Sequence, residues 1–254
     1  MIPKWIRRVF GERSGTSNDD KHLTVPTAAL KGVVRTKYDS PTPTAAQLSR
    51  KSRSIAAVKA LGLPYIEHLP VVEDETMVQP RNPQEVAKRC VAVALCAVKG
   101  ESNDQKLIDQ LVESYSAGQY FSPEEAAFIR NAAPERQKLI DFCWRYEGVH
   151  VFLWALGYLD KLNPPNTICE VAKEVGFIRD AGENFVNAAK LRPQSDLLDM
   201  TDLYYRLHWA AIDLRLKGKT SPGIDEGIIR ERHRALNWLT RYMNQEWDDT
   251  TTDT

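Results

Sequence analysis

The sequence predicts an all-α protein: a single multi-helix domain that follows a mostly irregular, basic N-terminal arm. Three observations support this prediction. Apolar residues recur at helical spacing through most of the chain, helix-start signals recur between these segments, and no run of strand-type residues or internal repeat is found. With 254 residues, 43% of them hydrophobic and 27% charged, the chain has the composition of a globular protein with one large domain.

The arm is expected to span residues 1–48. Residues 1–60 carry twelve Lys or Arg against four Asp or Glu, a net charge of +8, so residues 61–254 carry −8 in a chain of zero net charge. A solvated tail is the favoured interpretation, because Ser, Thr, Gly and Pro dominate much of the arm and bury little. Contact with phosphate, lipid or an acidic partner is the alternative. A membrane contact by residues 1–10 is a less favoured form of it, based on one apolar helical face.

The domain is expected to span residues 49–254 and to begin with two helices. The stretch "SRKSRSIAAVKALGLP" predicts a helix that starts at Ser49 and stops at Gly62. A long connection follows, with at most one short strand around Val71. An Asn-Pro-Gln-Glu start signal then opens a helix that is expected to cover residues 82–100.

The middle of the domain is expected to hold three helices. One follows the stripe in "NDQKLIDQLVESYSAG" and ends at Gly118. The next starts at Ser122, where "SPEE" forms a capping box. A single long helix then runs from Pro134 to Gly157 or Leu162.

Two further long helices are expected after a less regular stretch, residues 167–193. The first covers residues 195–216 and is closed by Gly218, and the second covers residues 225–244.

The stretch "FCWRYEGVHVFLWALGYLDKL" is apolar on every side, which predicts a central helix surrounded by others. Arg145 and Glu147 lie on opposite faces of it, so they cannot pair with each other. Each needs a partner from another element, because an unpaired buried charge costs several kcal/mol. Glu231 and Arg232 flank the apolar face of the last helix and are well placed to supply those partners.

Eight polar residues on the late helices therefore form one candidate set. The favoured interpretation is a buried network of ion pairs and hydrogen bonds that fixes how the helices pack. A ligand pocket is the alternative, and catalysis is the least favoured. The set consists of Arg145, Glu147, His150, Arg206, His208, Glu231, Arg232 and His233.

A second set is expected to contact a partner protein, because Trp and Arg are common interface anchors. The acidic ending "QEWDDTTTDT" carries one of these tryptophans, which predicts a tail that docks. The set consists of Trp238, Arg234, Arg241, Trp247, Asp248 and Asp249.

No motif for phosphate binding, dinucleotide binding, a catalytic serine or a zinc protease is found. We therefore predict no catalytic residue, metal or cofactor, although the spacing of the histidines neither supports nor excludes a shared metal. Zero net charge and helix-bound aromatic residues argue against a specific nucleic-acid partner. The four cysteines show no paired spacing, which favours a reducing compartment.

Several segments together resemble the bacterial domain-of-unknown-function family numbered 4272, over about residues 49–254. They are "RKSRSIAAVKALGLPYIEHLPVVED", "RNPQEVAKRCVAVAL", "FCWRYEGVHVFLWALGYLDKL", "DLYYRLHWAAIDLRLKGK" and "ERHRALNWLTRYMNQEWDDTTTDT". The resemblance implies a bacterial, soluble, cytoplasmic domain and transfers no catalytic residues.

We expect a non-enzymatic binding protein that recognises a macromolecular partner, in the manner of a toxin-neutralising immunity protein or an accessory protein. The alternative is an enzyme or small-molecule binder with a pocket for an anionic ligand, since arginines favour anions. That pocket would be ringed by Arg145, Glu147, Arg206, His208, Glu231 and His233.

Overall fold

A computed structural model of the chain describes residues 42–254. The predictions made for residues 1–41, including most of the basic arm and the membrane contact, lie outside these residues. The described part contains helices and no strand, which confirms the all-α prediction, and the stretch around Val71 is irregular. In chain order the elements are α2 (Ala45–Ala60), α3 (Pro83–Ser102), α4 (Gln105–Ser114), the 3-10 turn η1 (Ala117–Gln119), α5 (Pro123–Arg130), α6 (Arg136–Cys143), α7 (Tyr146–Ala155), α8 (Val171–Ala181), α9 (Asn184–Asn187), α10 (Gln194–Leu216), α11 (Glu226–Leu239) and η2 (Tyr242–Asn244).

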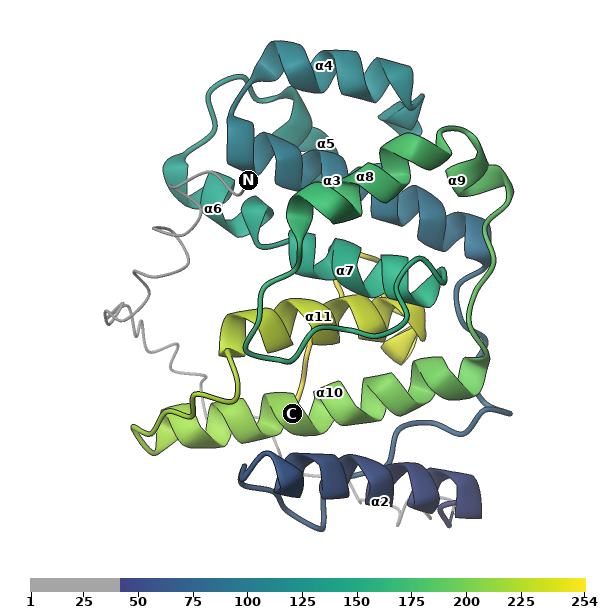
Figure 1. Cartoon of the computed structure of the whole chain (residues 1–254), viewed down its shortest axis with the longest axis vertical. Coiled ribbons are helices and arrows are strands. Elements are labelled where there is room, and N and C mark those ends of the chain that lie inside the picture. The colour runs from purple at the N-terminus through teal and green to yellow at the C-terminus, as the bar shows by residue number, and fades with distance from the viewer. Residues whose placement is uncertain (1–41) are drawn as a thin grey trace, which may run out of the picture.

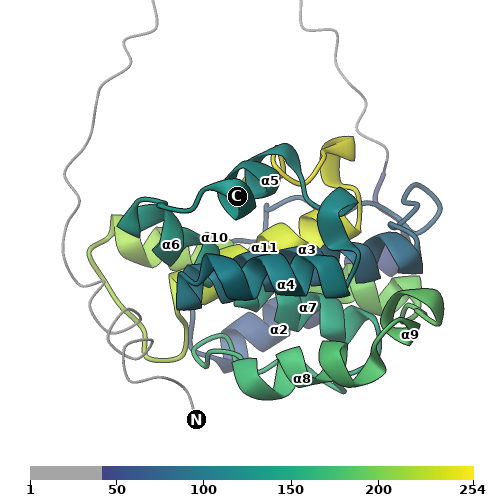
Figure 2. The same ribbon diagram turned by 90° about the horizontal axis from the view of Figure 1, so that it is seen from above.

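The helices stack in the order α2, α10, α11, α7, α3 and α4 along the long axis of the molecule (Figure 1). Viewed from above, α5 and α6 flank this stack on one side, and α8 and α9 flank it on the other (Figure 2). Every residue of α7 is buried, because α3, α8 and α11 all pack against it. The prediction of a central helix is therefore confirmed.

Three helices begin at capping boxes, in which a cap side chain and the third helical residue satisfy each other's backbone amides. Asn82 caps α3 and Ser122 caps α5, as predicted. Thr44 forms the third box with Gln47, so α2 begins at Ala45, four residues before the predicted start. The folded region therefore extends into the segment assigned to the arm.

The long helix predicted from Pro134 is wrong, since two helices, α6 and α7, occupy its place. Between them Trp144 and Arg145 turn more tightly: the amides of Glu147 and Gly148 donate to carbonyls three residues back, at 3.1 and 2.9 Å. α6 packs very closely on α3, where a Cβ on Gly100 would lie 2.6 Å from the Leu139 carbonyl oxygen. On either side of the break, α6 and α7 both pack against α3.

Three other boundaries differ from the predictions. α4 ends at Ser114 instead of Gly118, because Ser116 takes a positive φ of 49° that ends the helix. The last helix ends at Leu239, before Arg241 turns to a φ of 57°. The stretch predicted to be less regular contains α8 and α9. By contrast, Gly218 closes α10 as predicted, at a φ of 61°.

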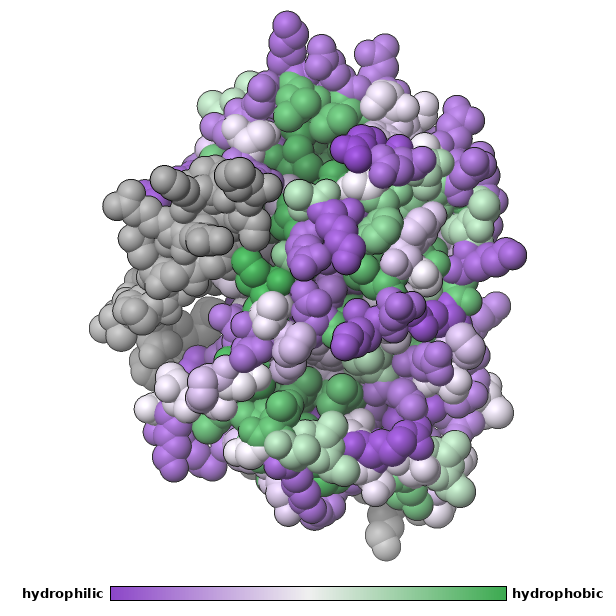
Figure 3. Space-filling model, viewed as in Figure 1, coloured by the Kyte–Doolittle hydropathy of each residue, from purple (hydrophilic) through white to green (hydrophobic). Residues whose placement is uncertain are grey.

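Hydrophilic and hydrophobic residues are interspersed across the face shown in Figure 3. None of the helices between residues 42 and 254 has both the length and the apolar composition that a membrane span requires.

Candidate functional site

Arg145 and Glu147, the two charged residues singled out in the 142–162 stretch, find their partners on α11, as predicted. Nη1 of Arg145 donates to Oε2 of Glu231 at 2.8 Å, and Nε of Arg232 donates to Oε2 of Glu147 at 2.8 Å. The two ion pairs run in opposite senses, with the arginine on the α7 side in one and on α11 in the other. They fix the register between the two helices.

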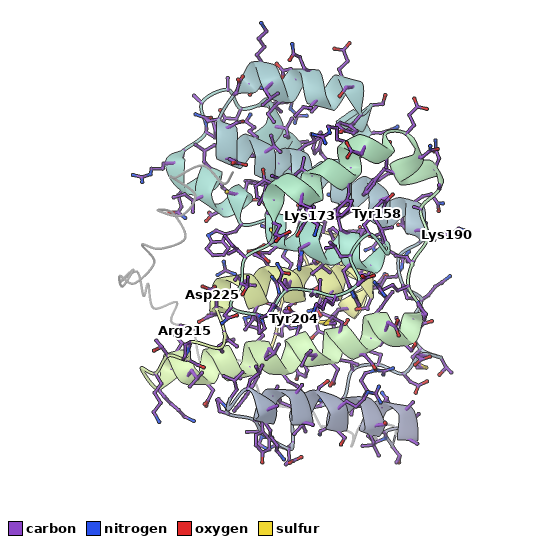
Figure 4. All side chains as sticks on the ribbon, viewed as in Figure 1. Tyr158, Lys173, Lys190, Tyr204, Arg215 and Asp225 are labelled. Carbon is purple, nitrogen blue, oxygen red and sulfur yellow. The ribbon has the colours of Figure 1, made fainter. Side chains whose placement is uncertain are left out.

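Arg232 is the centre of this network and is fully buried. Besides Glu147, its guanidinium donates to the hydroxyl of Tyr204, at 2.9 Å, and to the carbonyl oxygens of Asn163 and Thr167, at 2.7 and 2.9 Å. Tyr204 lies between α10 and α11 (Figure 4). One side chain therefore joins α7, α10, α11 and the connection that follows α7.

His150 also binds the connection that follows α7. Its Nε2 accepts from the backbone amide of Asn163 at 2.9 Å, so its Nδ1 carries the proton that is shared with Oε1 of Glu174 at 2.7 Å. The second carboxylate oxygen of Glu147, Oε1, accepts from the backbone amide of Cys169 at 2.9 Å. These bonds hold α8 and the preceding loop on α7.

Arg206 has a comparable structural role on α10. It forms a bidentate ion pair with Asp202, in which both N···O distances are 2.9 Å, and it also donates to the carbonyl oxygen of Pro70 at 2.9 Å. Both side chains of the ion pair are buried. The pair tethers the long connection between α2 and α3.

His208 and His233 form a third group, with their Nδ1 atoms 3.0 Å apart. Burial lowers the pKa of His208 to about 4, and burial together with His208 lowers that of His233 to about 3. Both rings are therefore neutral at pH 7, and one Nδ1–H donates to the other ring.

The eight residues of the first candidate set thus form separate local groups. The six that were expected to ring an anion pocket do not share one cavity, because Glu147 and Arg206 are enclosed by their own ion pairs. Arg145 and Glu231 line a cleft at one end of α11, and His233 lines a different cavity. The predicted ring is wrong in this respect.

In the second candidate set, two members are core residues. Trp238 and Trp247 are buried and pack around Phe152, with ring centroids 5.5 and 5.8 Å from it. Neither indole ring is exposed enough to contact a partner protein. Trp247 is where the tail docks, as predicted, and the guanidinium of Arg234 lies 4.4 Å from its ring centroid.

The other members of that set lie at or near the surface. Oδ2 of Asp248 accepts from the backbone amide of Glu124 at the start of α5, at 2.9 Å. Arg241 lies 3.4 Å from the carboxylate of Glu85, and Asp249 is exposed.

A mixed-charge cleft of about 470 Å³ is the place where the two sets meet. It lies between α5, α6, the start of α11 and the docked tail, and it contains four cationic and four acidic side chains. Two buried atoms of lining side chains, Nη1 of Arg234 and Oδ1 of Asp248, have no hydrogen-bond partner among residues 42–254. We call it the α11 cleft; it is lined by Glu124, Lys138, Asp141, Phe142, Trp144, Arg145, Arg230, Glu231, Arg234, Asp248 and Thr250 to Thr252.

Residues 50–250 match the family described as Domain of unknown function (DUF4272). The chain belongs to this family. The match covers nearly the range over which the resemblance was noticed, which confirms it. Comparisons with curated proteins and with solved structures found no match.

The DUF4272 match assigns no activity, so the cleft residues have to be judged by geometry. Sequence reasoning missed Lys138 and Glu124, which form an exposed ion pair of 2.8 Å at the rim. Glu124 was read only as a helix-start residue. Arg230 was also missed, although it lies one turn before the predicted Arg234 on the same face of α11, and this spacing could have marked it.

Between residues 42 and 254, no three His, Cys, Asp or Glu side chains are grouped so that they could hold an ion. All four cysteines are buried free thiols, and burial raises the pKa of each. They behave as small core residues.

Proposed function

We propose that this chain is a non-enzymatic binding protein that recognises another protein through the α11 cleft. The observation that carries the proposal is the charge pattern of this cleft, where four cationic and four acidic side chains from separate elements gather. A protein surface can offer acidic groups to the cationic side chains of the cleft and basic groups to its carboxylates.

The charges of the cleft favour a protein over a nucleic acid. Lys138 and Arg230 are about half exposed at the rim, and Glu124 is similarly exposed beside them. Both signs of charge therefore face the approaching partner. A polyanion would be repelled by the acidic half, whereas a protein surface can carry the complementary pattern of both signs.

The central network supports a binding role over catalysis. His150 and Arg232 use their polar atoms on main-chain or side-chain partners that hold the fold together, and Arg206 forms a buried ion pair with Asp202. A catalytic group must instead reach the reacting atoms of a substrate. At the rim of the cleft, by contrast, the side chains of Lys138 and Arg230 are about half exposed to an approaching partner.

We also propose a bacterial, cytoplasmic setting and a toxin-neutralising or accessory role. The resemblance stated from the sequence supports the bacterial source, and four free core thiols support a reducing compartment. An immunity-like protein would use the cleft as its recognition surface, because neutralisation needs a partner of complementary charge.

The test is affinity purification from the native host, followed by titration of the recovered partner. The variants are Arg230→Glu, which reverses a charge at the cleft rim, and Lys173→Glu, a matched reversal on exposed α8. We expect the wild type and Lys173→Glu to retain a stoichiometric protein. Arg230→Glu should weaken that complex at least tenfold, about 1.4 kcal/mol.

Two results would contradict the proposal. One is the recovery of no stoichiometric protein by the wild type. The other is equal affinity of the Arg230→Glu and Lys173→Glu variants for the partner, which would place the interface elsewhere.

A further inference from the structure

A second cavity, of about 350 Å³, lies on another side of α11, away from the ion pairs of the central network. It is formed by α10, α11, the irregular segment near residue 70 and the tail near residue 253. Its size falls within the range of small-molecule sites. The residues that decide its chemistry are Glu73, Tyr205, His233, Asn237, Tyr242 and Asp253.

The floor of the cavity carries polar groups that the protein leaves unused. His233 and Asn237 are only 2% and 3% exposed, yet both line the cavity. Nδ1 of His233 faces His208, but no hydrogen bond from residues 42–254 reaches its Nε2. The amide nitrogen of Asn237 donates to the carbonyl oxygen of Thr251 at 2.9 Å, and its Oδ1 accepts nothing from the described chain. A ligand donor would satisfy both atoms.

The charge of the cavity is negative. Glu73 and Asp253 are exposed at its mouth, and no lysine or arginine is among the residues that line it. His233 adds no positive charge at neutral pH because burial keeps its pKa low. Burial, Asp253 and Glu73 together raise the pKa of Tyr242, so both carboxylates act on the cavity wall.

Two tyrosine rings and an apolar strip complete the walls. Tyr205 and Tyr242 line the cavity together with Pro70, Val71 and Val72. Arg206 lies 5.9 Å from the Tyr205 ring, but Asp202 neutralises it in a buried ion pair. Aromatic faces and carboxylates with no competing cation are the features that recognise organic ammonium groups.

We propose that this cavity binds a small organic cation, a primary ammonium group on a short apolar chain. The ammonium donates to Nε2 of His233 and Oδ1 of Asn237, and its charge is balanced by Glu73 and Asp253. This selects the tautomer in which His233 donates through Nδ1 to His208. The apolar chain lies against Val71, Val72 and the tyrosine rings.

Three probes of equal chain length test the charge requirement on the full-length protein: pentylammonium, 1-pentanol and pentanoate. Saturation-transfer NMR and calorimetric titration at pH 7 measure binding. We expect pentylammonium to bind at least tenfold more tightly than 1-pentanol, and pentanoate not to bind. Absence of pentylammonium binding at 10 mM, equal binding of the alcohol, or preference for pentanoate would each overturn the proposal.

Surface variants locate the site without threatening the fold. Glu73→Gln and Asp253→Asn remove one negative charge each and should each weaken pentylammonium binding at least threefold, while 1-pentanol binding is unchanged. Glu67→Gln removes a charge from an exposed residue outside the cavity and should leave all binding unchanged. If Glu67→Gln weakens binding as much as Glu73→Gln, the amine binds through general attraction and the assignment fails.

Discussion

The helix α11 passes through two polar regions that use the same residue types in opposite ways. At its centre, Arg232 meets Glu147, Tyr204 and two carbonyl oxygens, and the side chain is fully enclosed. Two residues away on either side, Arg230 and Arg234 face the α11 cleft. The composition of a polar cluster therefore says little about its role: Arg232 is buried and holds the fold together, whereas Arg230 is about half exposed at the rim of a cleft.

We expect the largest loss of stability from breaking the buried network around Arg232. Arg232→Met leaves Glu147 buried without its counter-charge, which we expect to lower the free energy of unfolding by about 3–5 kcal/mol. Urea denaturation followed by circular dichroism measures this loss. Arg230→Met, on the same helix but half exposed, is the control and should stay within about 0.5 kcal/mol of wild type. A loss below about 1 kcal/mol for Arg232→Met would contradict the structural role.

We expect the second largest loss of stability from a substitution in the docked tail. Trp247→Ala removes a buried indole that contacts Phe152 and Trp238, and we expect a loss of about 3–4 kcal/mol. The same denaturation experiment measures it. Trp247→Phe, which keeps an aromatic ring over the core, should recover at least half of the loss; no recovery would mean that the indole itself is required.

Acid should weaken the fold through the histidine pair. Because the folded-state pKa values of His208 and His233 are depressed, to about 4 and 3, the unfolded chain binds more protons below pH 6.5. The stability they contribute is present above pH 6.5 and is lost as the pH falls toward the folded values. Between pH 6.5 and 5 we expect a decrease on the order of 2–3 kcal/mol.

Thermal unfolding across that pH range measures the slope, and His208→Gln provides the comparison. The variant should show about half the wild-type slope between pH 6.5 and 5. An unchanged slope would show that other groups take up the protons.

The smallest stability effect is expected at the cleft rim. Lys138→Met breaks an exposed ion pair with Glu124, which contributes about 0–1 kcal/mol, so unfolding should hardly change. Affinity for a protein partner should nevertheless decrease if the cleft is the recognition surface. A destabilisation well above 1 kcal/mol with unchanged partner affinity would make the cleft part of the scaffold.

Much of this architecture could be predicted from local pattern. The wholly apolar 142–162 stretch indicated a central helix, and the opposite faces of Arg145 and Glu147 required partners that Glu231 and Arg232 supply. The break at Trp144 could not be predicted, since no glycine or proline marks it and the close packing on Gly100 is a tertiary contact.

The two cavities could not be predicted from the sequence, for a related reason. His233, Glu73 and Asp253 come from segments far apart in the chain, and only the fold brings them to one place. The sequence also favoured surface roles for Trp238 and Trp247, because an aromatic residue beside charges suits an interface and a core equally well. Their burial depends on Phe152, which no spacing along the chain connects to them.

The position of Trp247 also bears on how the chain is made. This ring closes over Phe152 from a point near the end of the described sequence, and Arg89, Arg145 and Arg234 lie around it within about 6 Å. A nascent polypeptide that has not yet emerged past this residue leaves Phe152 and Trp238 uncovered. The hydrophobic surface around Phe152 and Trp238 therefore stays exposed until Trp247 has emerged, and a chaperone can bind it during that interval.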